Sequence, residues 1–235
     1  MQKTLIITGC SSGIGRAVAR KLLNQYQVIG LSRDCQQFTQ THPNFSPYQL
    51  DLSNLETLPK QLKQLAKTYP KIDGVIFCAG YGQFASLEEF SYQQIQSLIN
   101  TNFTAQVFLT RALLPQLKRQ PHSNLIYIGS EAALKGARKG TIYCASKFAL
   151  RGFTQALREE SARSHVSVSL INPGMVRTEF FDELNFEPGD DNNQALLAED
   201  VAEAVIYILN SRTGTVIDEI TLNPLNKVVK FKKTD

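Results

Sequence analysis

Short apolar runs alternate along the chain with longer segments of helical periodicity. Continuous apolar runs predict seven strands, at residues 4–8, 28–31, 48–50, 75–78, 125–128, 166–171 and 215–222. Apolar positions at steps of three and four predict helices near residues 14–23, 55–65, 91–115, 141–163 and 201–209. Because the strands are apolar throughout rather than alternating, they indicate a parallel sheet covered on both faces. We therefore expect an α/β protein with one doubly wound (Rossmann) domain over residues 1–235, a seven-stranded, mostly parallel sheet and helices on both faces.

Two segments have patterns of their own. In the helix near residues 141–163 the spacing selects a buried face, made of Ile142, Ala145, Ala149, Phe153 and Leu157. Residues 179–194 combine a Phe pair, a Pro-Gly step and an acidic cluster, which predicts an irregular excursion from the sheet.

Composition and charge exclude several classes of protein. The chain has 235 residues, of which 43% are hydrophobic and 20% charged, as is usual for a globular domain. Its formal charge is +4, and residues 227–235, with four Lys and one Asp, supply +3 of it. The remainder is nearly neutral, so a nucleic-acid partner has little electrostatic support, and we expect the short basic tail to be a solvated end.

The cysteines and the longest apolar runs bear on location. Cys10, Cys35, Cys78 and Cys144 form no C-x-x-C pair and are interpreted as reduced thiols, with no metal site. No run approaches the about 18 apolar residues of a membrane span, and the N-terminus lacks the flanks of a signal peptide. A cytoplasmic location without a membrane partner is the default expectation.

A glycine-rich loop follows the first predicted strand. Gly9, Gly13 and Gly15 stand in the pattern G-x-x-x-G-x-G between that strand and the next helix. Glycines there permit a tight turn and let backbone N–H groups approach a pyrophosphate, which the helix N-terminus also attracts. The loop therefore indicates a dinucleotide site. The spacing is one residue longer than in G-x-G-x-x-G, and a turn without a ligand is the alternative.

The end of the second predicted strand bears on which dinucleotide binds. In NAD sites a carboxylate there bonds the ribose hydroxyls, whereas this chain has Ser32 and Arg33. Because a guanidinium forms charge-assisted bonds with a 2′-phosphate, we expect NADP(H), with NAD(H) as the less favoured cofactor. Asp34, one residue further on, and a merely solvated Arg33 keep the second cofactor open.

Four polar residues are candidates for catalysis. Tyr143 and Lys147 are four positions apart on one predicted helix and share a face, so an ammonium can stabilise a phenolate and make the tyrosine an acid-base group. Ser130 follows the fifth predicted strand at the same edge of the sheet, and Asn102 interrupts the apolar stripe of the long helix. Taken singly, each has an ordinary structural alternative, such as a turn serine or a core asparagine.

Together these features resemble the short-chain dehydrogenase/reductase family, in its compact single-domain form, over nearly the whole chain. The matches follow the family's order: T-G-x-x-x-G-x-G at residues 8–15, an acidic residue at Asp51, Ala-Gly at 79–80, Asn102, Ser130, Y-x-x-x-K at 143–147 and P-G-x-V-x-T at 173–178. Their order and spacing are more specific than any one motif. One departure is visible, because Phe77 and Cys78 replace the Asn-Asn that usually precedes Ala-Gly.

The resemblance implies roles for individual residues. Tyr143 would protonate a carbonyl oxygen that Ser130 polarises, while hydride passes from the nicotinamide to the carbonyl carbon. Lys147 would bond the nicotinamide ribose and lower the pKa of Tyr143, and Asn102 would hold a water that links Lys147 to solvent. The implied cofactor contacts are Gly9, Ser11, Ser12, Gly13, Ile14 and Gly15 at the phosphates, Arg33 at the 2′-phosphate, Asp51 and Leu52 at the adenine, and Ala79, Gly80, Pro173, Gly174, Val176 and Thr178 along the ribose and nicotinamide.

The resemblance also implies partners. The substrate is expected to be a small carbonyl or alcohol, met by a substrate loop at about residues 178–197, in which Phe180, Phe181, Leu184 and Phe186 suggest an apolar lid. Glu131, beside Ser130, is a candidate contact for a polar or cationic group. NADPH pools favour the reductase direction, and helices beginning near residues 91 and 141 would form a homodimer or homotetramer.

Two alternatives remain. A non-catalytic NADP(H)-binding protein that senses redox state would use the same loop, although such relatives commonly lose the Tyr or the Lys that are both present here. A nucleotide-sugar epimerase or dehydratase would need a substrate domain that 235 residues do not provide.

Overall fold

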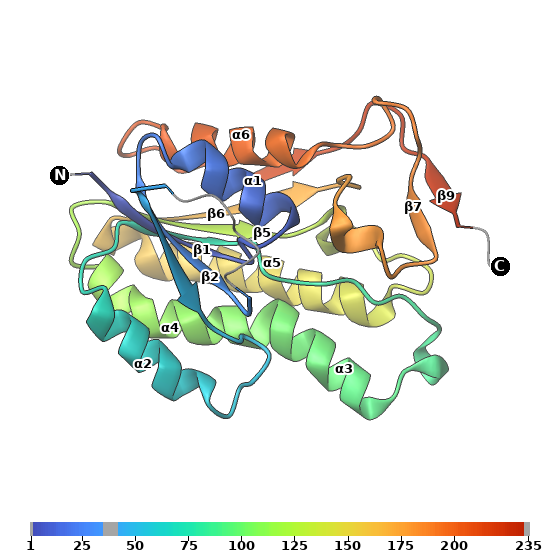
Figure 1. The fold of residues 1–235 in the computed structure, drawn as a ribbon, viewed down its shortest axis with the longest axis horizontal. Helices are drawn as coiled ribbons and strands as arrows, with labels where there is room; N and C mark the ends of the chain where they lie inside the picture. The colour runs from blue at the N-terminus through green and yellow to red at the C-terminus, as the bar shows by residue number, and fades with distance from the viewer. Residues whose placement is uncertain (1, 35–41, 233–235) are drawn as a thin grey trace.

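The computed structural model of the chain describes residues 2–34 and 42–232, so Cys35 and the last three residues of the tail lie outside the description. Seven strands form one sheet in the order β3-β2-β1-β4-β5-β6-β8, and every neighbouring pair is parallel (Figure 1). The strands are β1 Thr4–Thr8, β2 Gln27–Ser32, β3 Phe45–Gln49, β4 Gly74–Phe77, β5 Ser123–Ile128, β6 Val166–Pro173 and β8 Glu219–Leu222. The predicted doubly wound, single-domain sheet is confirmed.

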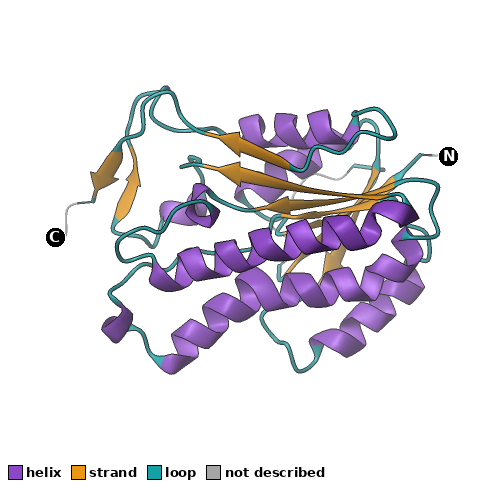
Figure 2. Cartoon of the chain, turned by 180° about the vertical axis from the view of Figure 1, so that it is seen from behind, coloured by secondary structure: helices purple, strands orange, loops and turns teal. Residues whose placement is uncertain are grey.

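Helices cover both faces of the sheet, as Figure 2 also shows from behind. They are α1 Gly13–Leu22, α2 Leu58–Thr68, α3 Tyr92–Ile99, α4 Ala105–Leu117, α5 Thr141–Ser161 and α6 Ala198–Leu209. One apolar cluster joins α2, α4 and α5 to the sheet, and a second joins α1 and α6 to the opposite face. Burial on both sides explains why the central strands are apolar without alternation.

Several predicted boundaries are wrong. The third strand begins at Phe45 rather than residue 48, and the last spans only Glu219–Leu222 rather than 215–222. Both are edge strands that are partly exposed, so they lack the continuous apolar run that marks the interior strands. The helix predicted near residues 91–115 is interrupted by a π turn, η2 Asn100–Thr104, and then continues through Pro115 to Leu117.

The predicted buried face of α5 is also wrong. Ala145 is exposed, and Ile142, Ala149 and Phe153 are only partly buried, so of the predicted set Leu157 alone is fully inside. The face that contacts the sheet is instead built from Tyr143, Cys144, Ser146, Lys147, Leu150, Thr154 and Leu157. Apolar periodicity misplaced this face because its inner positions are largely polar.

The basic tail is exposed, and it also pairs with the excursion after β6. Within the excursion after β6, a short strand β7 Phe186–Pro188 pairs antiparallel with β9 Val229–Phe231 of the tail (Figure 1). Lys230 Nζ lies 2.9 Å from the carboxylate of Asp190, and Lys232 Nζ donates to the carbonyl of Asp182 at 3.0 Å. Lysines of the tail thus contact the acidic excursion. Lys230 and Asp190 are 40 positions apart, so local charge patterns do not predict this contact.

Across the described residues, no helix combines the length and apolar character needed to cross a membrane. In the same part of the chain, no group of three or more His, Cys, Asp and Glu side chains is arranged to hold a metal ion.

Candidate active site

The glycine loop lies where the strand order reverses, between β1 and β4. Thr8 Oγ1 accepts hydrogen bonds from the backbone N–H groups of Cys78 and Ala79, both at 3.0 Å, and so ties the ends of these two strands together. Gly9 has φ +67°, and a Cβ there would lie 2.9 Å from the Cα of Ala79. A Cβ on Gly15 would lie 2.2 Å from the carbonyl oxygen of Gly9. Only glycine permits this close approach, which brings the N-terminus of α1 to the carboxyl edge of the sheet.

The departure at Phe77 and Cys78 leaves this arrangement intact. The Phe77 ring is buried in the core and stacks on Tyr127 with ring centres 4.2 Å apart, so its side chain serves packing. Cys78 contributes a backbone N–H to Thr8, a contact that any non-proline residue can make. Burial raises the pKa of the Cys78 thiol, which keeps it protonated at neutral pH.

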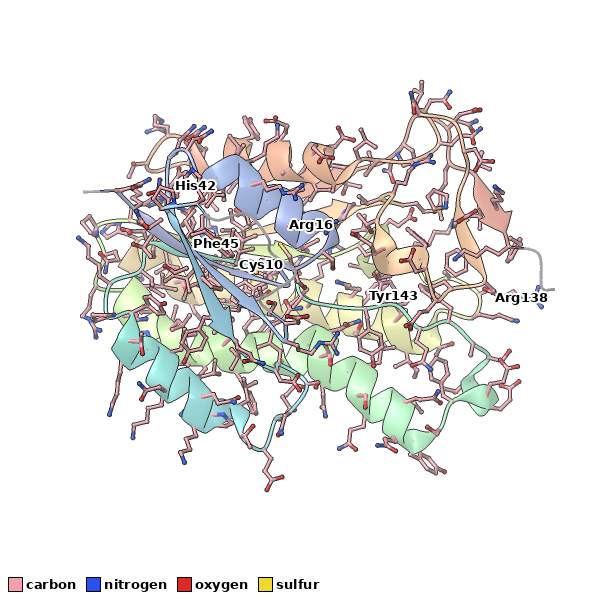
Figure 3. All side chains as sticks on the ribbon, in the orientation of Figure 1. Cys10, Arg16, His42, Phe45, Arg138 and Tyr143 are labelled. Atoms are coloured by element: carbon pink, nitrogen blue, oxygen red, sulfur yellow. The ribbon has the colours of Figure 1, made fainter. Side chains whose placement is uncertain are left out.

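Tyr143, Lys147 and Ser130 converge at the same edge. The two α5 residues lie one turn apart, with Lys147 Nζ 5.8 Å from the centre of the Tyr143 ring (the tyrosine is labelled in Figure 3). Lys147 Nζ also donates to the carbonyl of Ile128 at 3.0 Å, at the end of β5. Ser130, two residues further on, shares a side-chain hydrogen bond with Tyr143. The sheet edge therefore presents a hydroxyl, a phenol and an ammonium group in one cluster.

Burial dominates the acid-base properties of the pair. Desolvation raises the pKa of Tyr143 to about 12, although the hydrogen bond with Ser130 opposes the rise. Desolvation lowers the pKa of Lys147 to about 8, while Cys78 acts in the opposite sense. In the chain without cofactor the Tyr143 pKa is therefore raised, and not lowered as expected from Lys147, because burial outweighs the hydrogen bond with Ser130. The phenol is protonated at neutral pH and is ready to donate.

Asn102 is fully buried at the centre of the π turn and faces α5. Its side-chain carbonyl accepts from the backbone N–H of Tyr81 at 3.0 Å, and its amide donates to the carbonyl of Tyr81 at 2.9 Å. The amide also lies 3.4 Å from the hydroxyl of Ser146. Asn102 thus clamps the chain just after Gly80, where a Cβ would lie 3.9 Å from Lys147 Nζ.

Asn172 is a positioning residue that motif analysis missed. At the end of β6, its buried side chain accepts a hydrogen bond from the backbone N–H of Ser130 at 3.2 Å and donates to Glu219 of β8. A Cβ on Gly129 would lie 2.1 Å from the Asn172 oxygen, so glycine is required before the serine. The position directly before Pro173 was the available signal, since it places Asn172 at the sheet's carboxyl edge.

The remaining cofactor candidates lie along the carboxyl edge of the sheet. Arg33 is exposed at the end of β2, Asp51 accepts from the backbone N–H of Ser53 at 2.9 Å, and Leu52 packs in the core. Thr178 lies against the glycine loop, since a Cβ added to Gly13 would be 3.4 Å from the Cβ of Thr178. The others follow the same edge: Ser11, Ser12 and Ile14 at the start of α1, Ala79 and Gly80 after β4, and Gly174 and Val176 after β6.

Aromatic and charged side chains from the excursion, from the loops after β4 and β5 and from the tail lie over this edge. The Phe84 and Phe180 rings lie 5.0 Å and 6.0 Å from the Tyr143 ring, and Phe186 contacts Phe84 at 5.1 Å. Tyr143 is consequently only 7% exposed. Glu131 is held by Lys227 of the tail at 2.6 Å.

The carboxylate of Glu179 reaches back to the glycine loop. Glu179 is the first residue of η5 Glu179–Phe181, and its Oε2 accepts a hydrogen bond from the Gly13 N–H at 3.1 Å. Its other oxygen pairs with Arg16 on α1. Motif analysis missed this contact, because nothing in the local sequence shows that Glu179 and Gly13 meet.

Known proteins share this sequence pattern and fold. Residues 3–188 match the family model described as short chain dehydrogenase. An uncharacterized oxidoreductase of Staphylococcus aureus (strain N315) is 30% identical, covering 95% of this chain and 97% of the relative. An NADP-dependent 3-hydroxy acid dehydrogenase of Schizosaccharomyces pombe is 28% identical, covering 94% and 92%.

The structural comparison agrees. A solved structure of serine dehydrogenase complexed with NADP+ superposes with a TM-score of 0.84 at 28% identity, covering 93% of this chain and 94% of that one. The chain therefore belongs to the short-chain dehydrogenase family and is an oxidoreductase of that type.

Proposed function

We propose that the chain is an NADP(H)-dependent oxidoreductase that moves hydride between the nicotinamide and a small carbonyl or alcohol, acting as a reductase. The observation that carries the proposal is the convergence of Ser130, Tyr143 and Lys147 beside the glycine loop. The protonated state of Tyr143 at neutral pH supports the reductase direction, because reduction of a carbonyl needs a proton donor.

The glycine loop fits the phosphates of a dinucleotide. A Cβ at Gly9 or Gly15 would push the loop away from its close contact with the chain after β4, and the Gly13 N–H already donates a hydrogen bond to an anion, the carboxylate of Glu179. Ser11, Ser12, Ile14 and Thr178 border the same site. The loop therefore has the backbone N–H donors and the small residues that a pyrophosphate requires.

The choice of NADP(H) over NAD(H) rests on Arg33. Its exposed guanidinium is available to a 2′-phosphate, while no carboxylate stands at Ser32 or Arg33 to bond a free ribose hydroxyl. The name of the Schizosaccharomyces pombe relative and the NADP+ complex of serine dehydrogenase point the same way. Asp51 and Leu52 would border the adenine.

Each residue of the cluster has a defined task. Tyr143 donates its phenolic proton to the oxygen of the carbonyl substrate, and Ser130 donates a hydrogen bond to the same oxygen. Lys147 bonds the ribose and keeps positive charge beside the phenolate that Tyr143 leaves behind. The bound cofactor supplies the hydride. Asn102 fixes the chain around Gly80, and its role in holding a water stays a prediction.

The excursion is proposed as the substrate loop. Residues 178–197 bring Phe180 and Phe186 toward Tyr143, together with Phe84 from the loop after β4. An aromatic wall of this kind favours a substrate with an apolar body next to its carbonyl. The names of the relatives differ in their substrates, so the wall gives the class and not the compound.

The chain is further proposed to form a homodimer or homotetramer through α3 and α5. The outer face of α5 carries Ala145, Phe148 and Gly152, all exposed, and Phe148 is 44% exposed. On α3, Tyr92 is 93% exposed. Small and apolar residues on an outer helix face permit close contact with a second copy. Sedimentation equilibrium tests this directly, and a monomer at micromolar concentration would contradict it.

The function is tested by titrating the purified protein with NADPH and with NADH, and then following NADPH oxidation with a panel of aldehydes, ketones, diketones and quinones. The proposal predicts tighter binding of NADPH and turnover of at least one panel member. Tight NADPH binding without any turnover would favour the redox-sensing alternative. A preference for NADH would contradict the role of Arg33.

A further inference from the structure

One short helical turn contacts both halves of the active site. Glu179 and Phe180 are neighbours in η5, yet the carboxylate lies on the Gly13 N–H at 3.1 Å while the Phe180 ring lies 6.0 Å from the Tyr143 ring. The pairing of Glu179 with Arg16, which is labelled on α1 in Figure 3, brings the excursion against the start of that helix. The glycine loop and the catalytic tyrosine are therefore bridged by adjacent residues of one segment.

Glu179 occupies the loop as an anion. Burial opposes its ionisation, but hydrogen bonds from its own backbone N–H, from Arg16 and from Gly13 outweigh this and lower its pKa below the ordinary value. The carboxylate is consequently negative at neutral pH. An N–H that donates to one carboxylate oxygen is not free to donate to a phosphate oxygen, and two anions at one site repel each other.

Phe180, the second residue of η5, packs beside the Tyr143 ring. A Cβ on Gly82 would lie 2.4 Å from the tip of the Phe180 ring, so the ring rests against the backbone there. Together with Phe84, it leaves Tyr143 almost without exposed surface. Beyond η5, Lys232 of the tail donates to the carbonyls of Phe181 and Asp182. The segment is thus held at one end by Glu179 and at the other by the tail.

We propose that Glu179 is an internal competitor for the cofactor's phosphate, and that its displacement releases Phe180 from Tyr143. In the chain without cofactor, the carboxylate takes the Gly13 N–H and Arg16. A bound phosphate takes this place, and η5 turns about the Lys232 contact so that the Phe180 ring leaves the tyrosine. The substrate pocket therefore opens after the cofactor site is filled. This inference rests on the proposed function and adds a device that couples its two subsites.

The first test measures NADPH binding by isothermal titration calorimetry in wild type, Glu179→Gln and Glu183→Gln. Glu183 is an exposed residue of the same loop, so its variant makes the same change of charge away from Gly13. Glu179→Gln is expected to bind NADPH about threefold to tenfold more tightly, because a neutral amide competes less well for the N–H than a carboxylate. Glu183→Gln is expected to match wild type.

The outcomes separate the two levels of the account. Equal NADPH affinity in all three proteins, or weaker binding by Glu179→Gln, would overturn the internal competitor and leave the proposed function standing. Failure of all three proteins to bind NADPH would overturn the proposed function and the inference together.

The second test follows the movement of Phe180 without any turnover. The chain contains no tryptophan, so Phe180→Trp introduces a single reporter at the tyrosine. Saturating NADP+ is expected to shift its emission maximum to longer wavelength, as the ring moves into solvent. The double variant Glu179→Gln/Phe180→Trp is expected to have its tryptophan emission maximum at the longer wavelength already without NADP+. An unchanged emission maximum while calorimetry shows NADP+ bound would overturn the coupling, and the first test does not depend on this variant folding.

Discussion

The carboxyl edge of the sheet and the excursion that covers it are held together in different ways. At the edge, backbone groups meet directly: Thr8 joins β1 to β4, and Gly15 packs against the carbonyl of Gly9. The excursion is held largely by charged side chains, among them Arg16, Arg177 and Lys230, and by the short β7–β9 pair. The reacting groups therefore stand on a rigid frame, whereas the wall that meets the substrate is free to adjust.

The largest effect on activity should come from removing the proton donor, Tyr143, at the carboxyl edge. Tyr143→Phe keeps the ring that packs with Phe84 and Phe180 but removes the proton donor. We expect kcat for carbonyl reduction to fall by about a thousandfold or more, with the Kd for NADPH changed less than about threefold. Steady-state kinetics and calorimetry measure the two quantities. Retained turnover would remove Tyr143 from the acid-base role.

The next effect tests whether the loop needs its glycines. A Cβ in Gly15→Ala would lie 2.2 Å from a backbone oxygen, so α1 must shift away from the loop. We expect NADPH binding to weaken by about tenfold to a hundredfold, because the N–H donors move with the helix. Gly136→Ala is the control, since a Cβ at that loop position meets nothing within 4 Å. Equal NADPH affinity in the two variants would contradict the proposed geometry.

A pH profile sharpens the electrostatic part of the comparison. Burial lowers the pKa of Lys147 to about 8, so its ammonium is present below that pH and lost above it, while Tyr143, with a pKa of about 12, stays protonated. We therefore expect kcat/KM for reduction to be level below pH 8 and then to fall about tenfold per pH unit. A profile that stays flat from about pH 6 to pH 10 would show that the charge on Lys147 does not assist the reaction.

The smallest effect should come from the tail. A chain that ends at Asn226 loses β9, together with the contacts of Lys230 and Lys232. Because these contacts hold the excursion and not the core, we expect KM for the carbonyl substrate to rise about twofold to fivefold with little change in the thermal unfolding midpoint. A large drop in the unfolding midpoint would mean that the tail supports the whole fold.

The same division explains what the sequence reveals. Interior strands have a continuous apolar run, so local patterns predicted the sheet. The glycine loop and Y-x-x-x-K have fixed spacings, so motifs predicted that Ser130, Tyr143 and Lys147 would lie at one edge of it. The edge strands β3 and β8 were misplaced because partial exposure removes that pattern. The π turn at Asn102 also escaped prediction, and the hydrogen bonds of its side chain reach Tyr81 on another segment.

Contacts between distant segments account for the remaining errors. The buried face of α5 is polar because it carries the site, and its apolar outer face misled the periodicity. The lowered pKa expected for Tyr143 ignored how deeply the fold buries it. Glu179 contacts Gly13, 166 positions away in the sequence, and the basic tail contacts the acidic excursion. Both contacts form only in the folded chain, so no local sequence pattern predicts them.

The central claim is that this edge moves hydride from NADPH to a carbonyl carbon with Tyr143 as the proton donor. Its most direct test uses NADPH deuterated at the transferable C4 position, the carbonyl panel, and mass spectrometry of the products formed by wild type and by Tyr143→Phe. The account predicts an alcohol with one deuterium on its carbinol carbon from wild type and almost none from the variant. Alcohol whose carbinol hydrogen comes from water, or equal deuterium transfer by the variant, would contradict it.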